Sequence, residues 1–332
     1  MKTVLVLLMA ILAVNSLAID EQWMQFKKDH NKLYRSVADE EQHFKTFQAN
    51  LKKFEEHNKR YEAGEVTWFM KVTKFADMTS EEIAEYNGWK NYKTPTFEGL
   101  NITTLRADNI KDEIPGIFDW RDRGGITEVR DQGGCGSCWA FCAICSLENR
   151  YFIVHSQTKI SLSEQQLIDC SRNYNNNGCN GGYPPNAYNY IAQNDINRLE
   201  DYPYAGVDQN CRADGGKNVN VHLTGIVTIP EDDEESLRYA TYIQGAMNVG
   251  IHATDNFMHY GGGLFDDPTC NKYDRNHCVT VVGYGRENDQ DFWAVKNSWG
   301  PGWGEGGYIK MARKKDGQCG IAMTCFSPQL EG

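Results

Sequence analysis

The first 134 residues of this 332-residue chain contain no cysteine, although eleven cysteines follow between residues 135 and 325. Disulfides can therefore tie together only the later part of the chain, and the odd count leaves at least one thiol unpaired. The lack of a covalent link to the first third suggests a segment that can be removed.

The chain also lacks a surplus of basic residues and, beyond its N-terminus, any long apolar run. Its formal net charge of -11 argues against a nucleic-acid partner, since phosphate binding requires clustered Lys and Arg. No later stretch approaches the roughly 18 consecutive apolar residues of a transmembrane helix, so we expect no membrane anchor. A hydrophobic content of 40% allows a buried core in one large or two modest domains.

Residues 1–18 have the form of a secretory signal peptide. Lys2 precedes an apolar run from Val4 to Val14, and Ser16 and Ala18 are small residues at the two positions that signal peptidase reads. We therefore predict cleavage after Ala18 and entry into the secretory pathway, where disulfides can form. A buried N-terminal helix is the alternative reading, and the length of the run disfavours it.

Residues 20–86 are charged and mostly helical in pattern. Phe44, Phe47, Leu51 and Phe54 recur at spacings of three and four, which predicts a polar helix with one apolar stripe that must dock on something.

Two shorter elements follow that helix. Alternate residues from Val66 to Val72 are apolar, as in an edge strand, and Thr79 with Glu82 forms a capping box that opens a short helix. Residues 87–112 show no periodicity and are predicted to be a linker, which carries the one glycosylation sequon of the chain at Asn101.

Residues 113–332 differ in composition from the preceding part of the chain, with many glycines, aromatics and cysteines. Helical stretches are predicted from Ser137, Ser163 and Pro184, and strands at residues 279–283 and 292–296. An α half followed by a β half suggests two lobes with a cleft between them.

Cys138 stands out as a candidate nucleophile. It begins a helical run with Ser137 as the expected N-cap, so its sulfur would lie at the positive end of the helix dipole, which favours the thiolate. Three alternatives are a disulfide with Cys135, a thioredoxin-type redox pair, or half of a zinc site with Cys142 and Cys145. Redox pairs belong near a βαβ pattern, and structural zinc sites need a separated second pair, so catalysis is favoured.

Four segments resemble, in order, the papain and cathepsin family of cysteine peptidases: residues 114–121 at the mature N-terminus, residues 132–141 around the nucleophile, residues 276–285 and residues 293–304. The resemblance spans residues 113–332. It implies an α+β, papain-like two-lobe fold, with a helical lobe at about 113–225, a β-barrel-like lobe at about 226–332 and the active-site cleft between them. It implies peptide-bond hydrolysis on protein or peptide substrates, with no metal or other cofactor.

Roles follow from the resemblance. Cys138 would be the nucleophile, His277 its base, and Asn297 would orient the His277 ring under the shield of Trp299, while the Gln132 amide would bind the oxyanion. The other mature histidines are rivals on composition alone, and His252 is the nearest because it also lies in an apolar stretch: His155, His222, His252 and His259.

The resemblance implies three disulfides: Cys135–Cys179, Cys170–Cys211 and Cys270–Cys319. Cys138 stays free. The remaining four depart from the usual pattern and are either buried free thiols or one or two extra bridges: Cys142, Cys145, Cys278 and Cys325.

The resemblance also implies a substrate-binding set, in which the backbone of Gly181 and Gly182 pairs with an extended substrate. The pocket for the side chain two residues before the scissile bond should prefer Leu, Val or Phe. The set comprises Gly136, Ser137, Gly181, Gly182, Tyr183, Pro184, Gly250, Arg275, Cys278 and Thr324. Arg275 stands where relatives carry an apolar residue. Either it extends to solvent or pairs with Asp274, or it lies over the pocket mouth and disfavours basic side chains.

Residues 19–112 resemble the family's inhibitory propeptide, with departures. Phe47, Asn50, Asn58, Phe75 and Asp77 fit its two motifs, whereas Asp39, His43, Phe54, Lys71 and Thr73 differ from the usual residues. The implied precursor is inhibited by its own propeptide and is a monomer of a secreted, lysosomal or digestive compartment. The propeptide should loosen in acid, because protonation of its paired carboxylates removes native-state interactions; they include Glu40, Glu41, Asp77, Glu81 and Glu82. A family member without activity and an exopeptidase are the alternatives. Every expected catalytic residue is present, which disfavours an inactive family member. No inserted loop lies between Cys179 and Cys211, which disfavours an exopeptidase.

Overall fold

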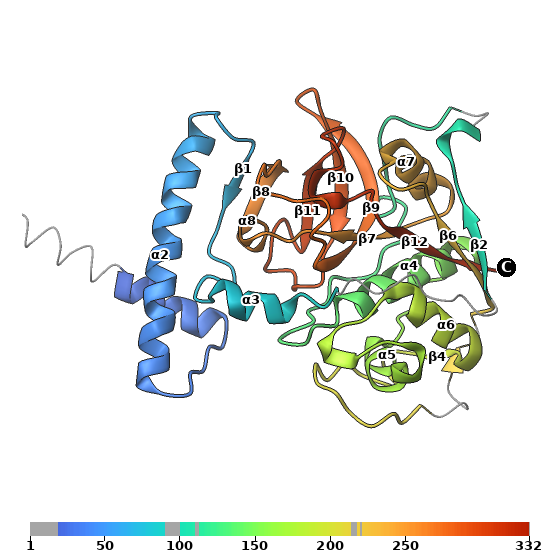
Figure 1. Ribbon diagram of the computed structural model, residues 1–332, viewed down its shortest axis with the longest axis horizontal. Helices are drawn as coiled ribbons and strands as arrows, with labels where there is room; N and C mark the ends of the chain where they lie inside the picture. Colours follow the sequence, from blue (N-terminus) through green and yellow to red (C-terminus); the bar gives the residue numbers. More distant parts are fainter. Residues whose placement is uncertain (1–18, 90–99, 110–112, 214–217, 220, 332) are drawn as a thin grey trace, which may run out of the picture.

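The computed structural model describes residues 19–89, 100–109, 113–213, 218–219 and 221–331, in which an N-terminal helical segment packs beside an α+β body (Figure 1). The predicted signal peptide lies outside the described residues. Across these ranges, no helix combines the length and apolar character needed to cross a bilayer.

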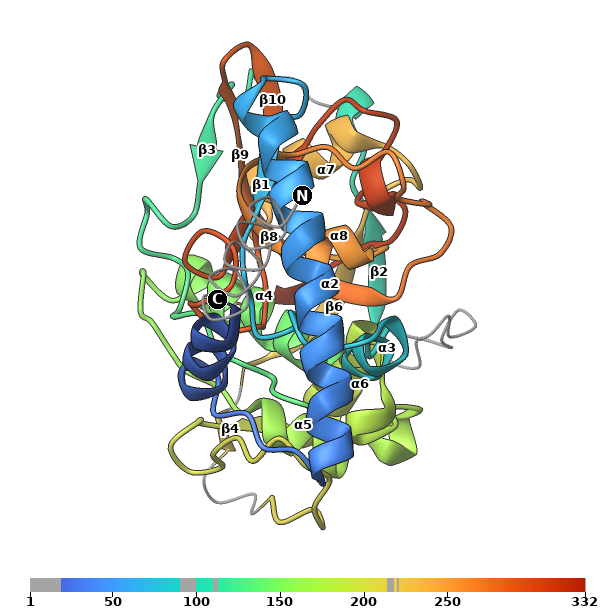
Figure 2. The ribbon, with the colours of Figure 1, turned by 90° about the vertical axis from the view of Figure 1, so that its left-hand side faces the viewer.

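The N-terminal segment consists of a helix at residues 19–29, α2 (Val37–Glu62), β1 (Trp68–Met70) and α3 (Ser80–Tyr86). The predicted apolar stripe of α2 buries Phe47 and Phe54, and Figure 2 shows α2 lying across one face of the body. Thr79 and Glu82 form the predicted capping box at the start of α3.

Helices dominate the first half of the body. They are α4 (Cys138–Val154), α5 (Glu164–Cys170) and α6 (Pro184–Asn194), with short turns η2 (Arg172–Tyr174) and η3 (Gly178–Asn180) and the pair β4 (Ile196–Asn197) and β5 (Asn218–Val219). Residues 138–149 of α4 are all buried, as expected of an apolar helix at the centre of a domain. The helices predicted from Ser163 and Pro184 are confirmed. The Ser163 side chain caps α5, and Pro184 takes the first position of α6, where its missing N–H is not needed.

Strands dominate the second half. They are β6 (Leu223–Thr228), β7 (Met247–Ile251), β8 (Tyr260–Phe265), β9 (His277–Glu287), β10 (Gln290–Lys296), β11 (Tyr308–Ala312) and β12 (Cys325–Leu330), with α7 (Glu234–Ile243), α8 (Asp255–Met258) and η4 (Gln318–Gly320). The sheet runs in the order β1-β8-β11-β10-β9-β7-β12-β6-β2, in which β2 is Asn101–Thr104. The strand β1 of the N-terminal segment thus extends one edge of it, antiparallel to β8.

The predicted linker is wrong in one part. Residues 101–104 form β2 (Asn101–Thr104), which pairs in parallel with β6 and is followed by η1 (Ala107–Asn109). All four side chains of β2 are exposed, so this strand is held through its backbone and leaves no apolar alternation in the sequence. Similarly, β3 (Phe118–Asp119) pairs with β9, which joins the start of the body to the β half.

Candidate active site

Cys138 is the first residue of α4 and is fully buried. Burial raises the pKa of its thiol, and nearby backbone N–H groups of Cys278, Gly88 and Trp139 oppose that rise. Two of these residues belong to the body, whereas Gly88 belongs to the N-terminal segment. The prediction that the Ser137 side chain caps α4 is wrong: Ser137 occupies the N-cap position, but its hydroxyl bonds to Tyr204 Oη at 2.8 Å instead.

His277 opens β9, and its ring is fixed by Asn297. Asn297 Oδ1 accepts hydrogen bonds from His277 Nε2 at 2.9 Å and from the Ser298 backbone N–H at 2.8 Å. Because Oδ1 is an acceptor, Nε2 carries the ring proton, and the lone pair of Nδ1 is left available for a proton. Nδ1 has no hydrogen-bond partner among the described residues. The next residue, Cys278, packs in one buried cluster with Cys138, so the thiol lies beside the start of β9.

Trp299 covers this histidine. Its ring stacks on His277 with centroids 4.5 Å apart, and Phe75 of the N-terminal segment packs edge-on against it at 5.0 Å. Only 2% of Trp299 is exposed, so the bond between His277 and Asn297 is kept from water.

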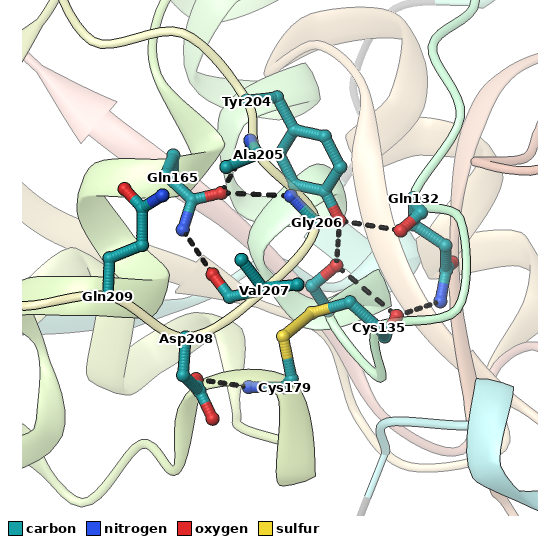
Figure 3. Close-up of a disulfide and its surroundings, with 12 residues drawn as sticks. Gln132, Cys135, Gln165, Cys179, Tyr204, Ala205, Gly206, Val207, Asp208 and Gln209 are labelled. Carbon is teal, nitrogen blue, oxygen red and sulfur yellow. Dashed lines mark hydrogen bonds between the residues drawn. A yellow bond between two sulfur atoms is a disulfide. The ribbon is translucent and has the colours of Figure 1, made fainter.

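Gln132 is held with its amide N–H groups directed toward the site. Nε2 donates to the carbonyls of Cys135 and Tyr86, both at 2.9 Å, and Oε1 accepts from Ser298 Oγ at 2.6 Å. Figure 3 shows Gln132 and Tyr204 beside the Cys135–Cys179 disulfide, with the Tyr204 hydroxyl donating to the Gln132 carbonyl. The Ser298 hydroxyl therefore sets which end of the Gln132 amide faces the site.

The segment that ends the N-terminal helices lies between the two halves of the body. The Gly88 carbonyl accepts from Gly182 N at 3.1 Å, and Trp89 N donates to the Asn276 carbonyl at 3.0 Å. A Cβ on Gly88 would lie 1.8 Å from the Gly136 carbonyl oxygen, so only glycine allows this approach. The Gly182 pairing predicted for a substrate is thus made by residues 88–89.

Trp89 fills a pocket formed by Tyr183, Gly250, Arg275 and Cys278, which we call the Trp89 pocket. The Trp89 and Tyr183 rings meet edge to face at 5.2 Å, and a Cβ on Gly250 would lie 2.9 Å from the Trp89 ring. Only 5% of Trp89 is exposed. Four residues of the predicted pocket therefore surround one apolar side chain.

Arg275 lies along the rim of the Trp89 pocket. Its Cδ is 3.3 Å from the place of a Cβ on Gly250, and its Nη1 donates to the Lys272 carbonyl at 2.9 Å. The Asp274 carboxylate accepts from Asn271 instead. Burial raises the pKa of Tyr183, and the positive charge of Arg275 opposes that rise.

Three further residues of the predicted substrate set have structural roles in the fold. Gly181 has φ 110° and bonds within its own loop through Gly178 and Asn177, so it does not pair with residues 88–89. Pro184 opens α6, and the Thr324 carbonyl accepts from Gly250 N at 3.2 Å.

The cysteines pair as the resemblance implied, through Cys135–Cys179, Cys170–Cys211 and Cys270–Cys319. The remaining five are free and buried: Cys138, Cys142, Cys145, Cys278 and Cys325. The alternative of a Cys135–Cys138 disulfide is therefore excluded. His252, the nearest rival of His277, accepts a hydrogen bond from the Asn271 backbone N–H through Nδ1 at 3.0 Å, which makes it a structural residue.

Burial sets the charges of the covered site. It raises the pKa of the Cys138 thiol to about 12 and lowers the pKa of His277 to about 4, although the bond to Asn297 opposes the second shift. Both shifts favour a neutral thiol and a neutral imidazole. The predicted thiolate is therefore disfavoured while residues 86–89 exclude water from the site.

Sequence reasoning missed the residues that cover and orient the site, namely Tyr86, Gly88, Trp89 and Ser298. The signal for Trp89 was a tryptophan in a stretch with no apolar pattern, since large aromatics outside a core often fill pockets. Nothing in the pattern around Ser298 indicates that its hydroxyl orients Gln132.

Comparisons with known proteins agree with this geometry. Residues 114–329 match the papain family cysteine protease domain, and residues 23–83 match the cathepsin propeptide inhibitor domain. The chain is 38% identical to a cathepsin L-like proteinase of Phaedon cochleariae, over 99% of this chain and 100% of that protein, and 39% identical to cathepsin L of Sarcophaga peregrina, over 99% and 100%. The solved structure of digestive procathepsin L 3 of Tenebrio molitor larval midgut superposes with a TM-score of 0.86 at 40% identity, covering 94% of this chain and 99% of that one.

Proposed function

Because this chain belongs to the papain family of cysteine proteases and carries a cathepsin propeptide inhibitor domain, we propose that it is a cathepsin L-like endopeptidase in which Cys138 attacks the peptide carbonyl. The observation that carries the proposal is the orientation of His277. Asn297 holds the Nε2 proton, which leaves Nδ1 as the base, and the next residue, Cys278, packs in one cluster with Cys138.

The reaction follows from these positions. His277 Nδ1 takes the thiol proton, and the thiolate adds to the substrate carbonyl carbon. The Gln132 amide and the Cys138 backbone N–H bind the oxyanion. The imidazolium then gives its proton to the leaving amine, and the resulting thioester is hydrolysed by a water that His277 deprotonates. Asn297 and Trp299 keep the ring in place through both halves of the cycle.

Residues 86–89 explain the latent state in this proposal. The Tyr86 carbonyl accepts the Gln132 amide hydrogen bond, the Gly88 carbonyl accepts from the Gly182 N–H, and Trp89 fills the pocket. Removing this segment admits water and substrate, which favours the thiolate and imidazolium. We place the mature N-terminus near residue 113, the propeptide at residues 19–112 and a signal peptide at residues 1–18, with a glycan on the exposed Asn101.

The chemistry of the Trp89 pocket suggests its substrates. An apolar ring already fills it, so Leu, Val or Phe two residues before the scissile bond should fit after release. The similarity to a digestive procathepsin supports secretion into a digestive or lysosomal compartment, where acid would loosen the propeptide. We propose that the enzyme acts there on protein and peptide substrates as a monomer.

The experiment is to activate the purified precursor and measure turnover of an internally quenched peptide blocked at both ends, beside the Cys138→Ala variant. An endopeptidase cleaves this peptide, whereas an exopeptidase needs a free end. We expect the variant to fold as a precursor and to retain less than about 1% of wild-type kcat/KM. Comparable turnover by both proteins would refute the assignment of Cys138.

A further inference from the structure

The active site has a second feature, a group of free thiols of which peptide hydrolysis uses only Cys138. Six of the eleven cysteines form disulfides, and the other five are free and buried: Cys138, Cys142, Cys145, Cys278 and Cys325. Cys142 of α4 and Cys278 of β9 pack in the same buried cluster. Burial and then the neighbouring Cys142 thiol raise the pKa of Cys278.

This pair adjoins the nucleophile. Cys278 packs against Cys138 in the same buried cluster, and Cys142 follows Cys138 by one turn of α4 on the same helix face. All three belong to one apolar cluster, which Trp89 and Tyr183 complete. Cys138, Cys278 and Cys142 thus form a short series of sulfurs.

The other two free thiols lie outside this cluster. Cys325 Sγ donates to the Ile321 carbonyl at 3.5 Å, and Cys145 borders the same cavity of about 20 Å³ as Cys142 and Cys278. That cavity has room for about one water molecule. Cys142 and Cys278 are therefore the two free thiols that pack in one cluster with the nucleophile.

We propose that Cys278 and Cys142 are a thiol relay that returns Cys138 to its reduced form after oxidation by hydrogen peroxide, and that stores the oxidation as a Cys142–Cys278 disulfide. The proposal goes beyond the proteolytic function but rests on Cys138 being the reactive thiol.

The relay has three balanced steps. The Cys138 thiol takes one oxygen atom from hydrogen peroxide to become a sulfenic acid, and water leaves. The Cys278 sulfur attacks the Cys138 sulfur, and the hydroxyl departs as a second water with the Cys278 proton. Cys142 then attacks Cys278 within the mixed disulfide, gives up its proton and releases the Cys138 thiol. In sum, two thiols and one peroxide become one disulfide and two waters.

The propeptide protects this system before activation. Trp89 packs in the cluster that holds all three sulfurs, and burial raises the pKa of both Cys138 and Cys278. Buried, protonated thiols react slowly with peroxide. The relay thus becomes available in the activated enzyme, when oxidation of Cys138 first threatens its function.

The test treats activated wild-type enzyme with one molar equivalent of hydrogen peroxide, in the absence of added thiols, and maps disulfides in a non-reduced digest. We expect activity to stay within about twofold of its starting value and one new cross-link, between the peptides of Cys142 and Cys278, which dithiothreitol removes. A digest without this cross-link would overturn the relay.

The Cys142→Ser variant isolates the last step, because the mixed disulfide can form but cannot be resolved. One equivalent of peroxide should lower its activity at least about tenfold from its own starting value, and dithiothreitol should restore it. Cys325→Ser is the matched control, since it removes a buried thiol outside the relay, and should respond as wild type does. A Cys142→Ser response equal to wild type would contradict the proposal. If that variant does not fold, the wild-type cross-link decides alone. Turnover before peroxide treatment reports separately on Cys138 as the nucleophile.

Discussion

Ser298 illustrates how one side chain can set the chemistry of another. Gln132 Oε1 accepts from the Ser298 hydroxyl at 2.6 Å, so its Nε2 faces the site. We predict that Ser298→Ala lowers kcat roughly tenfold with little change in KM, because the amide can then turn its oxygen toward the developing negative charge.

A double-mutant cycle with Gln132→Ala distinguishes this positioning role from a general loss of structure. If Ser298 acts through Gln132, the Ser298→Ala change should cost almost nothing once Gln132 is alanine. Independent, additive losses in the double variant would show that Ser298 acts in another way.

Arg275 offers a second prediction at the scale of one residue. Its guanidinium lies at the rim of the Trp89 pocket and bonds to the Lys272 carbonyl, which favours the reading that its charge reaches the substrate. We predict that Arg275→Met raises kcat/KM for peptides with Arg at the pocket position relative to Leu, and lowers it for Glu relative to Leu, each by about tenfold. Unchanged ratios for all three peptides would remove Arg275 from selectivity.

Among the elements of the propeptide, α2, β1 and the residues on both sides of α3 contact the peptidase body. Lys71 Nζ donates to the Gly304 carbonyl at 2.7 Å, Thr73 Oγ1 donates to the Met258 carbonyl at 3.0 Å, and Lys53 pairs with Asp255 at 2.6 Å. The exposed ion pair contributes little. Apolar burial and the β1–β8 pairing therefore provide most of the docking energy.

Trp89 should be the strongest of these apolar contacts. We predict that Trp89→Ala in the separate propeptide, residues 19–112, weakens inhibition of the mature enzyme roughly 100-fold, as expected for losing a buried tryptophan. Leu33→Ala is the matched control, because Leu33 is 95% exposed and its loss should leave the inhibition constant unchanged. Equal inhibition by the Trp89→Ala and wild-type segments would show that the pocket contact is dispensable.

His259 gives the docking of α2 a dependence on pH. It is buried against Phe54, with ring centroids 4.6 Å apart, and Thr73 Oγ1 lies 3.3 Å from its Nδ1. Burial lowers its pKa to about 4, while Asp255 opposes the shift and Lys53 adds to it. If the ring regains its ordinary pKa of 6.5 when uncovered, the free enzyme binds more protons than the complex between pH 6.5 and about 4. Docking is then at full strength above pH 6.5 and weakens as the pH falls.

We therefore predict that the inhibition constant of the propeptide rises about 30-fold between pH 7.5 and pH 5 through His259 alone. The His259→Gln variant keeps a neutral side chain at both values and should show a rise smaller by that factor. The measurement is the inhibition constant at four pH values. An identical pH profile for both enzymes would assign the acid sensitivity to other groups, such as the propeptide carboxylates.

For the whole molecule, the sequence was most informative where a pattern has one physical cause. The apolar stripe of α2 and the capping box of α3 were predicted because helical period and cap chemistry are local. The fold and the site residues were predicted instead from the resemblance to the papain and cathepsin family. Local patterns could not place Trp89 in its pocket, because the residues that form the pocket are brought together only by the fold of the body: Tyr183, Gly250, Arg275 and Cys278.

One error has a tertiary cause. Residues 101–104 form β2 through backbone pairing with β6 alone, which leaves no side-chain signal. The thiolate predicted for Cys138 stays a prediction for the activated enzyme, since in the covered precursor burial raises the pKa of this thiol. The sequence pattern shows neither the pairing of β2 nor the burial of Cys138, because both depend on tertiary contacts of the N-terminal segment.

We propose that Cys138 is a reactive nucleophile that the propeptide covers. To test this, the activated enzyme and the intact precursor are treated with a thiol-reactive peptidyl epoxide, and the adduct is located by peptide mass mapping. We expect a single adduct on Cys138 of the activated enzyme, loss of all peptidase activity, and labelling of the precursor at least about 100-fold more slowly. An adduct on another cysteine, or equally fast labelling of the precursor, would contradict it.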